Sequence, residues 1–218
     1  SEFPTGIKLK EIRTGEGIEI AFNSSVSPFN VEEVRKSAFY SIVPQKFNFI
    51  ADTPIVSLGF KVDANSWIPK PILWLEYFSD QSMTEENSEY LKVVNDQNIN
   101  IAVGDYGSHY LQSAELVSEQ LSNSGFKTSI QVLNRPEYSA RASGEESFQI
   151  IIGPPVPHFT PNSYLLSVLH SDGRLNTTGL RNKELDILIE KQSMEYDRVE
   201  RSETIRKINH ILFDEAHR

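Results

Sequence analysis

One short stretch of the sequence combines residue types that suit contact with a small ligand. Gly104-Asp105-Tyr106-Gly107 follows an apolar run, and Ser108 precedes apolar residues with helical spacing. The stretch is therefore expected at the amino terminus of a helix, where unpaired N–H groups and the helix dipole favour an anion or a carbonyl oxygen. Tyr106 offers a ring for stacking, and His109 offers a hydrogen-bond donor or acceptor. A plain glycine turn with a solvated histidine explains the same residues equally well.

Other kinds of chemistry find little support in the sequence. The histidines are scattered, without the spacing of metal ligands, at His109, His158, His170, His210 and His217. The chain has no cysteine, which excludes disulfides and thiol catalysis. There is no glycine-rich phosphate loop and no Gly-x-Ser-x-Gly motif, and the adjacent acids Glu145 and Glu146 are typical of a solvated turn. We therefore predict no catalytic residues, no metal site and no cofactor.

The elements that must position the candidate residues alternate in the centre of the chain. Apolar runs predict strands at 99–103, 128–133 and 148–152. A helix capped by Ser108 and closed by Gly125 is expected between the first two strands, because glycine readily adopts positive φ at a helix end. A shorter helix after Pro136 leads to the third strand. This alternation predicts an α/β fold with a largely parallel, covered sheet.

The regions on either side of this unit give weaker signals. An alternating run at 18–22 predicts a half-buried strand, and Asn30 is expected to cap a helix that stops at Pro44. Residues 52–80 are rich in proline and aromatic side chains, which favours a long ordered excursion. Residues 79–90 are polar and acidic, which is typical of an exposed loop or a short helix.

The end of the chain is predicted to be helical. Asn182 opens one helix, whose inward side chains are Leu185, Leu188 and Ile189. A second helix begins near Val199, and its apolar face consists of Ile205, Ile208, Ile211 and Leu212.

Composition sets limits on the class of protein. The length of 218 residues suits one large domain or two small ones, and a hydrophobic content of 39% is enough for a core. Thirty acidic and 21 basic residues give a net charge of −9, which repels phosphate backbones, so we predict no nucleic-acid binding by this chain. No run of about 18 apolar residues occurs, so no direct membrane span is expected.

Four stretches occur in an order that resembles a known family. They are Phe22-Asn23 with Pro28-Phe29, Val34-Arg35 and Ala38; Ala114 to Leu121 with Gly125-Phe126-Lys127; Phe148 to Gly153 with His170-Ser171-Asp172-Gly173; and Asn176, Gly179, Asn182, Glu184-Leu185-Asp186, Arg201 and Asp214-Glu215-Ala216. Residues 16–218 are similar to the second lobe of the family 5 (peptide/nickel-type) solute-binding proteins. Members of this family deliver peptides, nickel complexes and other solutes to ABC importers.

The resemblance implies a fold and a boundary. The expected fold is α/β, one lobe of the two-lobed type II periplasmic-binding-protein fold, with a mixed, mostly parallel sheet flanked by helices. Family chains are longer, so we expect a fragment that lacks the first lobe and the returning carboxyl-terminal strands. Residues 1–15 are then a tag, a linker or the crossover between lobes, and Ser1-Glu2-Phe3 resembles a cloning scar.

The resemblance also implies partners and a location. A small-molecule or peptide ligand would be shared with the absent first lobe and held by hinge closure. The other expected partners are the membrane subunits of an ABC transporter, and the expected location is extracytoplasmic. We expect structural roles for Asn23, Arg35 and Asp186, which match family positions.

Ligand contacts are implied in two loops, because family ligands lie at the carboxyl ends of the strands, as in open α/β sheets generally. The loops are 104–109 and 153–159, and the implied contact residues are Tyr106, His109, Pro155, Val156, His158 and Phe159. Prolines that merely stiffen the second loop are the plainer explanation of its sequence.

One expected family feature is missing from the second loop. Many peptide-binding members place an aspartate there that pairs with the α-ammonium of the ligand. The corresponding position is His158, or Pro157 with a one-residue gap, and no acid occurs from Gln149 to Ser171. An α-ammonium would lose a charge-assisted hydrogen bond worth about 1.5–3 kcal/mol. We therefore do not expect the usual recognition of a free peptide amino terminus.

An alternative interpretation keeps the fold and changes the function. Some bacterial transcription regulators fuse a winged-helix DNA-binding domain to the same solute-binding module, which then serves as a cytoplasmic ligand sensor. The missing aspartate is compatible with such a change of ligand. Cysteine content does not distinguish the two functions, because a cysteine-free chain suits either compartment.

Overall fold

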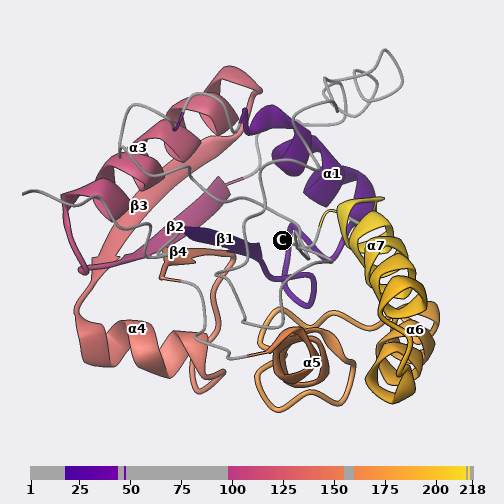
Figure 1. Cartoon of the computed structure of the whole chain (residues 1–218). Coiled ribbons are helices and arrows are strands. Elements are labelled where there is room, and N and C mark those ends of the chain that lie inside the picture. The colour runs from indigo at the N-terminus through magenta and orange to yellow at the C-terminus, as the bar shows by residue number, and fades with distance from the viewer. Residues whose placement is uncertain (1–17, 44–46, 48–97, 155–159, 215, 217–218) are drawn as a thin grey trace, which may run out of the picture.

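The computed structural model describes residues 18–43, 47, 98–154, 160–214 and 216. Within these residues a four-stranded sheet has the order β1-β4-β2-β3, which is visible in Figure 1. The strands are β1 Glu19–Phe22, β2 Asn98–Gly104, β3 Lys127–Leu133 and β4 Ile150–Gly153. β2 is parallel to both β3 and β4, and β1 is antiparallel to β4. The predicted α/β fold with a mixed, mostly parallel sheet is confirmed.

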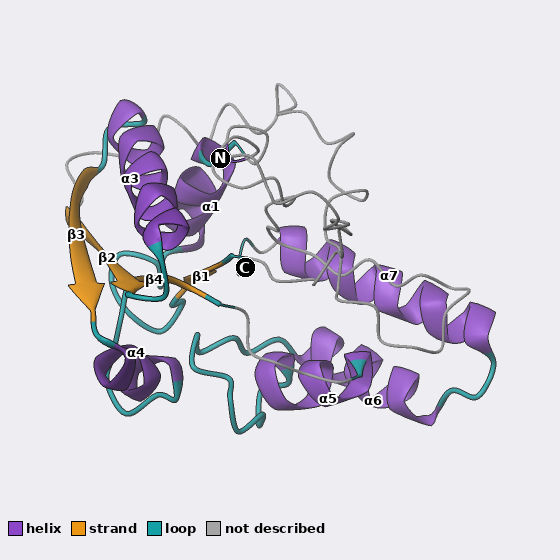
Figure 2. Ribbon diagram, turned by 60° about the vertical axis from the view of Figure 1, so that its left-hand side comes forward, coloured by secondary structure: helices purple, strands orange, loops and turns teal. Residues whose placement is uncertain are grey.

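Helices cover both faces of the sheet. α1 (Glu32–Ser41) and α3 (Ser108–Asn123) lie on one face, and α4 (Arg135–Ala142) lies on the other (Figures 1 and 2). Side chains alternate along a strand, so each strand contributes to both cores. The core under α1 and α3 includes Phe22, Ile101, Val103, Ala114, Val117, Leu121, Ile150 and Ile152, and the core under α4 includes Ala21, Ala102, Leu133, Tyr138, Phe148 and Ile151.

Two of the predicted helix caps are wrong, and one cap was not predicted. α1 begins after Val31, because Asn30 belongs to the preceding turn and donates its backbone N–H to the carbonyl of Val26. Ser108 is the first residue of α3, after Gly107. The unpredicted cap is Asn134, which forms a reciprocal capping box with Glu137 at the start of α4.

The carboxyl end of α3 follows the prediction. Gly125 has a φ of 97°, a left-handed conformation that glycine adopts without strain. The backbone N–H of Phe126 then donates to the carbonyl of Leu121 at 3.1 Å, and the chain enters β3.

A helical unit with its own core follows β4 (Figure 2). Its elements are α5 (Pro161–Tyr164), the π-helix η3 (Leu165–Leu169), α6 (Lys183–Met194) and α7 (Arg198–Asp214). The predicted inward residues of α6 and α7 are confirmed as buried or partly buried members of this core. The helical turns at 161–169 were not predicted. None of the helices within the described ranges has the length and apolar character needed to cross a membrane.

The helical unit joins the sheet at the end of β1. The backbone N–H and the hydroxyl of Ser24 both donate to the carbonyl of Thr178, each at 2.8 Å. Gly179 has a φ of 69°, and a Cβ there would lie 2.6 Å from the Cβ of Ser25. Ala216, after α7, is fully buried in the core under α1 and α3. The chain therefore leaves the sheet after β4 and returns to it after α7.

Several sequence predictions lie outside the described residues. These are the boundary at residues 1–15, the helix stop at Pro44, the excursion at 52–80 and the polar segment at 79–90.

Candidate functional site

The parallel strands bring three chain segments to one edge of the sheet. β2, β3 and β4 end at Gly104, Leu133 and Gly153. The helix that follows β2 lies on one face, whereas the helix that leads into β4 lies on the other, so the winding reverses between these neighbouring strands. In open α/β sheets, ligands bind outside the carboxyl ends of the strands at such a reversal. This edge is therefore the candidate ligand-binding site.

The loop after β2 is held in place by its own backbone and by Tyr106. The N–H of Asp105 donates to the carbonyl of Leu133 at 2.8 Å, and the N–H of Tyr106 donates to the carbonyl of Gly104 at 2.9 Å. The partly buried ring of Tyr106 packs edge-to-face against Tyr138 at 5.2 Å and Tyr110 at 6.1 Å between ring centroids. Tyr106 thus connects helices on opposite faces of the sheet.

Two glycines at the strand ends make room for this aromatic cluster. A Cβ at Gly104 would lie 2.7 Å from the ring of Tyr106 and 2.8 Å from the ring of Tyr138. A Cβ at Gly153 would overlap the hydroxyl of Tyr138. The Tyr138 side chain lies across the ends of both strands, which requires glycine at both positions.

His109 lies in the first turn of α3, beside the same loop. The centroid of its ring lies 4.1 Å from the ring centroid of Tyr110. The His109 ring also covers Gly107, because a Cβ added at Gly107 would lie 3.0 Å from a carbon of that ring. Within the described part of the chain, the ring nitrogens of His109 have no hydrogen-bond partner. Contact between His109 and a ligand stays a prediction.

The edge also carries two exposed charges of opposite sign. The guanidinium carbon of Arg135 lies 5.3 Å from the ring centroid of Tyr106, which is a cation–π contact. Asp105 is exposed on the neighbouring loop. Neither side chain forms an ion pair with any residue in the described ranges. The carboxylate of Glu137, the acid on the first turn of α4, accepts the backbone N–H of Asn134 at 3.0 Å.

Arg135 was missed at the sequence level, although a signal for it was available. It follows β3 almost directly, and β3 ends at the same edge as β2 and β4. Ligand contacts were predicted only in the loops that follow the other two strands. Of the predicted contact residues, the structure describes Tyr106 and His109; Pro155, Val156, His158 and Phe159 lie outside the described residues.

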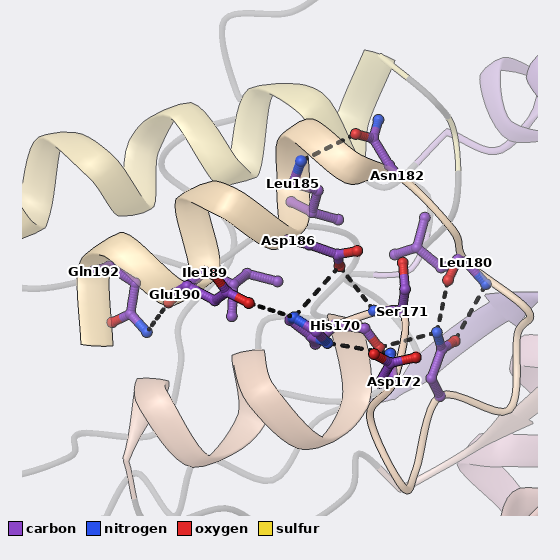
Figure 3. Close-up of polar contacts among 11 residues, drawn as sticks. His170, Ser171, Asp172, Leu180, Asn182, Leu185, Asp186, Ile189, Glu190 and Gln192 are labelled. Carbon is purple, nitrogen blue, oxygen red and sulfur yellow. Dashed lines mark hydrogen bonds and ion pairs between the residues drawn. The ribbon is translucent and has the colours of Figure 1, made fainter. Parts of the chain in front are cut away.

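A second polar cluster, shown in Figure 3, centres on His170 at the end of η3. Its Nδ1 accepts the N–H of Asp172 at 3.1 Å, so the neutral ring carries its proton on Nε2. Nε2 faces Glu190 at 3.5 Å and Asp186 at 3.9 Å. Asp186 also accepts the N–H of Ser171 at 2.8 Å.

Two asparagines complete this cluster. The side-chain amide of Asn176 donates to the carbonyls of His170 (3.1 Å) and Leu180 (2.7 Å), and its oxygen accepts the N–H of Leu180 at 3.2 Å. Asn182 caps α6 by accepting the N–H of Leu185 at 3.0 Å, as predicted. These contacts bind the loop at 170–182 to α6, so we assign the cluster a structural role.

Asn23, Arg35 and Asp186, for which structural roles were expected, each form a hydrogen bond that holds the local structure. Asp186 supports the loop through Ser171, Asn23 accepts the N–H of Ser25 at 3.0 Å, and Arg35 donates to the carbonyl of Phe29 at 2.7 Å. Among the described residues, no group of three or more histidine, aspartate or glutamate side chains is arranged to hold a metal ion.

Comparisons with known proteins agree on the fold. No protein-family model matches the sequence, and no curated protein matches it. The structure is similar to an oligopeptide-binding protein from Bacillus subtilis in complex with a nonapeptide (TM-score 0.68, 15% identity, 92% of this chain and 43% of that one). It is also similar to the murein tripeptide binding protein of Escherichia coli (0.74, 18%, 92% and 41%) and to a nickel ABC transporter structure from Bacillus halodurans (0.66, 16%, 94% and 45%).

These similarities confirm the sequence-level resemblance at the level of fold. The chain has the α/β fold of one part of the peptide- and nickel-type solute-binding proteins, and it spans less than half the length of the similar chains. The two peptide-related structures are those of binding proteins.

Proposed function

We propose that residues 16–218 form the ligand-binding lobe of an extracytoplasmic solute-binding protein that delivers a small solute to an ABC transporter. The observation that carries the proposal is the fold, which the chain shares over almost its whole length with peptide-binding and nickel-transport proteins. The carboxyl edge of the sheet supports it, because this edge combines a reversal of winding with polar side chains that have no hydrogen-bond or ion-pair partner among the described residues.

The proposed mechanism is closure of two lobes around the solute. A ligand that contacts both lobes stabilises the closed state by the difference between its affinities for the closed and open forms. On this lobe Tyr106 and His109 would contact the ligand from the loop after β2. Pro155, Val156, His158 and Phe159 would contact it from the loop after β4, and the membrane subunits of the transporter would receive the closed form.

This mechanism assigns the chain only part of the ligand contacts. Association has a large entropic cost that half a site offsets poorly. We therefore expect weak or undetectable solute binding by the 218-residue chain alone. Micromolar binding of a small solute to this chain, measured by calorimetry, would overturn the proposed division of the site between two lobes.

Cell fractionation of the natural full-length protein, with intact mass and amino-terminal sequencing, tests the proposed location. A processed, lipid-modified or periplasmic form supports delivery to an importer. An unprocessed cytoplasmic form with a basic amino-terminal domain contradicts it and favours the ligand-sensing regulator. DNA binding should then be measured with and without candidate ligands.

A further inference from the structure

We propose that the solute carries an oxyanion, a carboxylate or a phosphate, and that Arg135 is the residue of this lobe that recognises it. The inference rests on the proposed function and deepens it, because it names the chemical class of the ligand group bound at the carboxyl edge. It is carried by the position of Arg135, by its lack of an acidic partner and by the aromatic support beneath it.

The first observation is a contrast between two arginines of the same short helix. Arg141, in the last turn of α4, contacts Glu146 at 3.3 Å and Gln131 at 3.0 Å. Arg135, in the first turn, has neither an ion pair nor a hydrogen bond of its guanidinium within the described ranges. The chain has an excess of acids, with a net charge of −9, yet the cation at the candidate site has no acidic partner in these ranges.

The second observation is that the guanidinium is held in place. Its carbon lies 5.3 Å from the ring centroid of Tyr106, and Tyr106 is itself packed against Tyr110 and Tyr138. A guanidinium stacked on an aromatic ring keeps its N–H groups free at the edge of its plane. These groups match the two oxygens of a carboxylate or a phosphate, and holding them in place reduces the entropy lost on binding.

The surroundings of Arg135 favour an anion over a cation. Glu137 is occupied by the capping box of α4, and Asp105 makes no ion pair with Arg135. The N-cap of α3 is Gly107, which has no side chain to accept the N–H groups of the first turn. The ring nitrogens of His109, which have no hydrogen-bond partner among the described residues, add a hydrogen-bond donor on the same loop.

The test uses NMR on the ¹⁵N-labelled 218-residue chain, with acetate and inorganic phosphate as separate probes at constant ionic strength. Each probe meets only part of the site, so binding is weak, and we expect saturable shifts at the Arg135 side chain and at residues 106–109 at high probe concentrations that NMR can follow. Arg135→Gln should weaken the affinity by about tenfold or more, the value of a charge-assisted bidentate contact. Arg141→Gln removes the same charge from the same helix and should leave the affinity within about twofold, since it lies away from the edge.

Further variants separate recognition from folding. Tyr106→Phe keeps the ring and should preserve anion binding, whereas Tyr106→Leu removes the support and should weaken it. Arg135→Lys keeps the charge but loses the planar fork, so it should bind less tightly than the unmodified chain. Thermal unfolding of each variant verifies that the fold is retained. Arg135 is exposed, so we expect its substitution to leave stability almost unchanged.

Each outcome has a defined meaning. Chemical-shift changes that depend on Arg135 support the inference. The probe that binds more tightly, acetate or inorganic phosphate, identifies the ligand group as a carboxylate or a phosphate. Absence of shifts in the unmodified chain, or equal responses in Arg135→Gln and Arg141→Gln, overturns it. Neither probe requires the other lobe or cellular location, so a failure here leaves the proposed transport function standing, and a cytoplasmic location of the full-length protein leaves this inference standing.

Discussion

Replacement of Asn176 by alanine should destabilise the protein more than replacement of Asn100 by alanine. Among the described residues the side chain forms four hydrogen bonds: two donated to the carbonyls of His170 and Leu180, and two accepted by its oxygen from the N–H of Leu180 and the hydroxyl of Thr178. His170 retains a second donor, the N–H of Gly173 at 2.8 Å, but both backbone groups of Leu180 lose the amide. At about 0.5–1.5 kcal/mol for each bond, the expected loss is about 2–3 kcal/mol.

Chemical denaturation of the 218-residue chain measures this loss directly. For a protein of this size it corresponds to a decrease in Tm of about 5–10 °C. Asn100→Ala is the matched control, because among the described residues the Asn100 side chain makes one exposed hydrogen bond, to Ser129 at 3.3 Å. We expect the control to change stability by no more than about 0.5 kcal/mol.

A second substitution at the same position tests the reasoning more severely. Asn176→Asp preserves the size and the acceptor for the N–H of Leu180, but it directs a carboxylate oxygen at two carbonyl oxygens. It should therefore destabilise at least as much as alanine does. A stability equal to that of the unmodified chain for either variant would refute the role assigned to Asn176.

Three further outcomes follow from the contacts described. Gly153→Ala should lower the free energy of unfolding by about 1–3 kcal/mol, because its Cβ overlaps the Tyr138 hydroxyl. In a double-mutant cycle Tyr138→Leu should recover part of that loss, and purely additive effects would contradict the overlap. Gln149→Leu should lower the free energy of unfolding in urea by about 1–3 kcal/mol, because the Gln149 side chain accepts the N–H of Asn100 and donates to the carbonyl of Ser27, each at 2.7 Å. Gln131→Leu, at an exposed position on β3, is the control, and equal losses in the two variants would refute the role of Gln149. In calorimetry of the full-length protein, amino-acetylation of a short peptide should change its affinity by less than about tenfold, because no acid occurs from Gln149 to Ser171; a strong preference for the free amine would show that another residue replaces the missing aspartate.

The central α/β unit could be predicted from local sequence because its signals are local. Apolar runs mark β2, β3 and β4, and Gly125 marks the end of α3 through its own backbone freedom. The prediction that Asn30 caps α1 was wrong because Asn30 lies in a turn, where its backbone N–H donates to the carbonyl of Val26. The residue types alone do not indicate this backbone hydrogen bond. The π-helix at Leu165–Leu169 gave no periodic signal, since its spacing differs from that of an α-helix.

The candidate site was less predictable than the fold. Tyr106 and His109 lie at the carboxyl edge, where they were expected, because Tyr106 follows β2 and His109 lies in the first turn of α3. Their contact with a ligand stays a prediction. Arg135 depends on a contact across the edge, in which a residue of the second crossover meets the ring of Tyr106. Sequence spacing of 29 positions carries no information on such a contact. The role of Asp186 shows the same limit, since its partner Ser171 lies in a different element.

The return of the chain to the sheet at Ala216 has a consequence for local opening. The helical unit has a core of its own, and it is attached to the sheet by the bonds between Ser24 and Thr178 and by the contact of Gly179 with Ser25. Regions with separate cores open as separate cooperative units in hydrogen exchange. Amide protons of α6 and α7 should therefore exchange together, on a timescale distinct from that of β2 and β4. Weakening the Ser24 contact should accelerate exchange in the helices while the sheet keeps its protection.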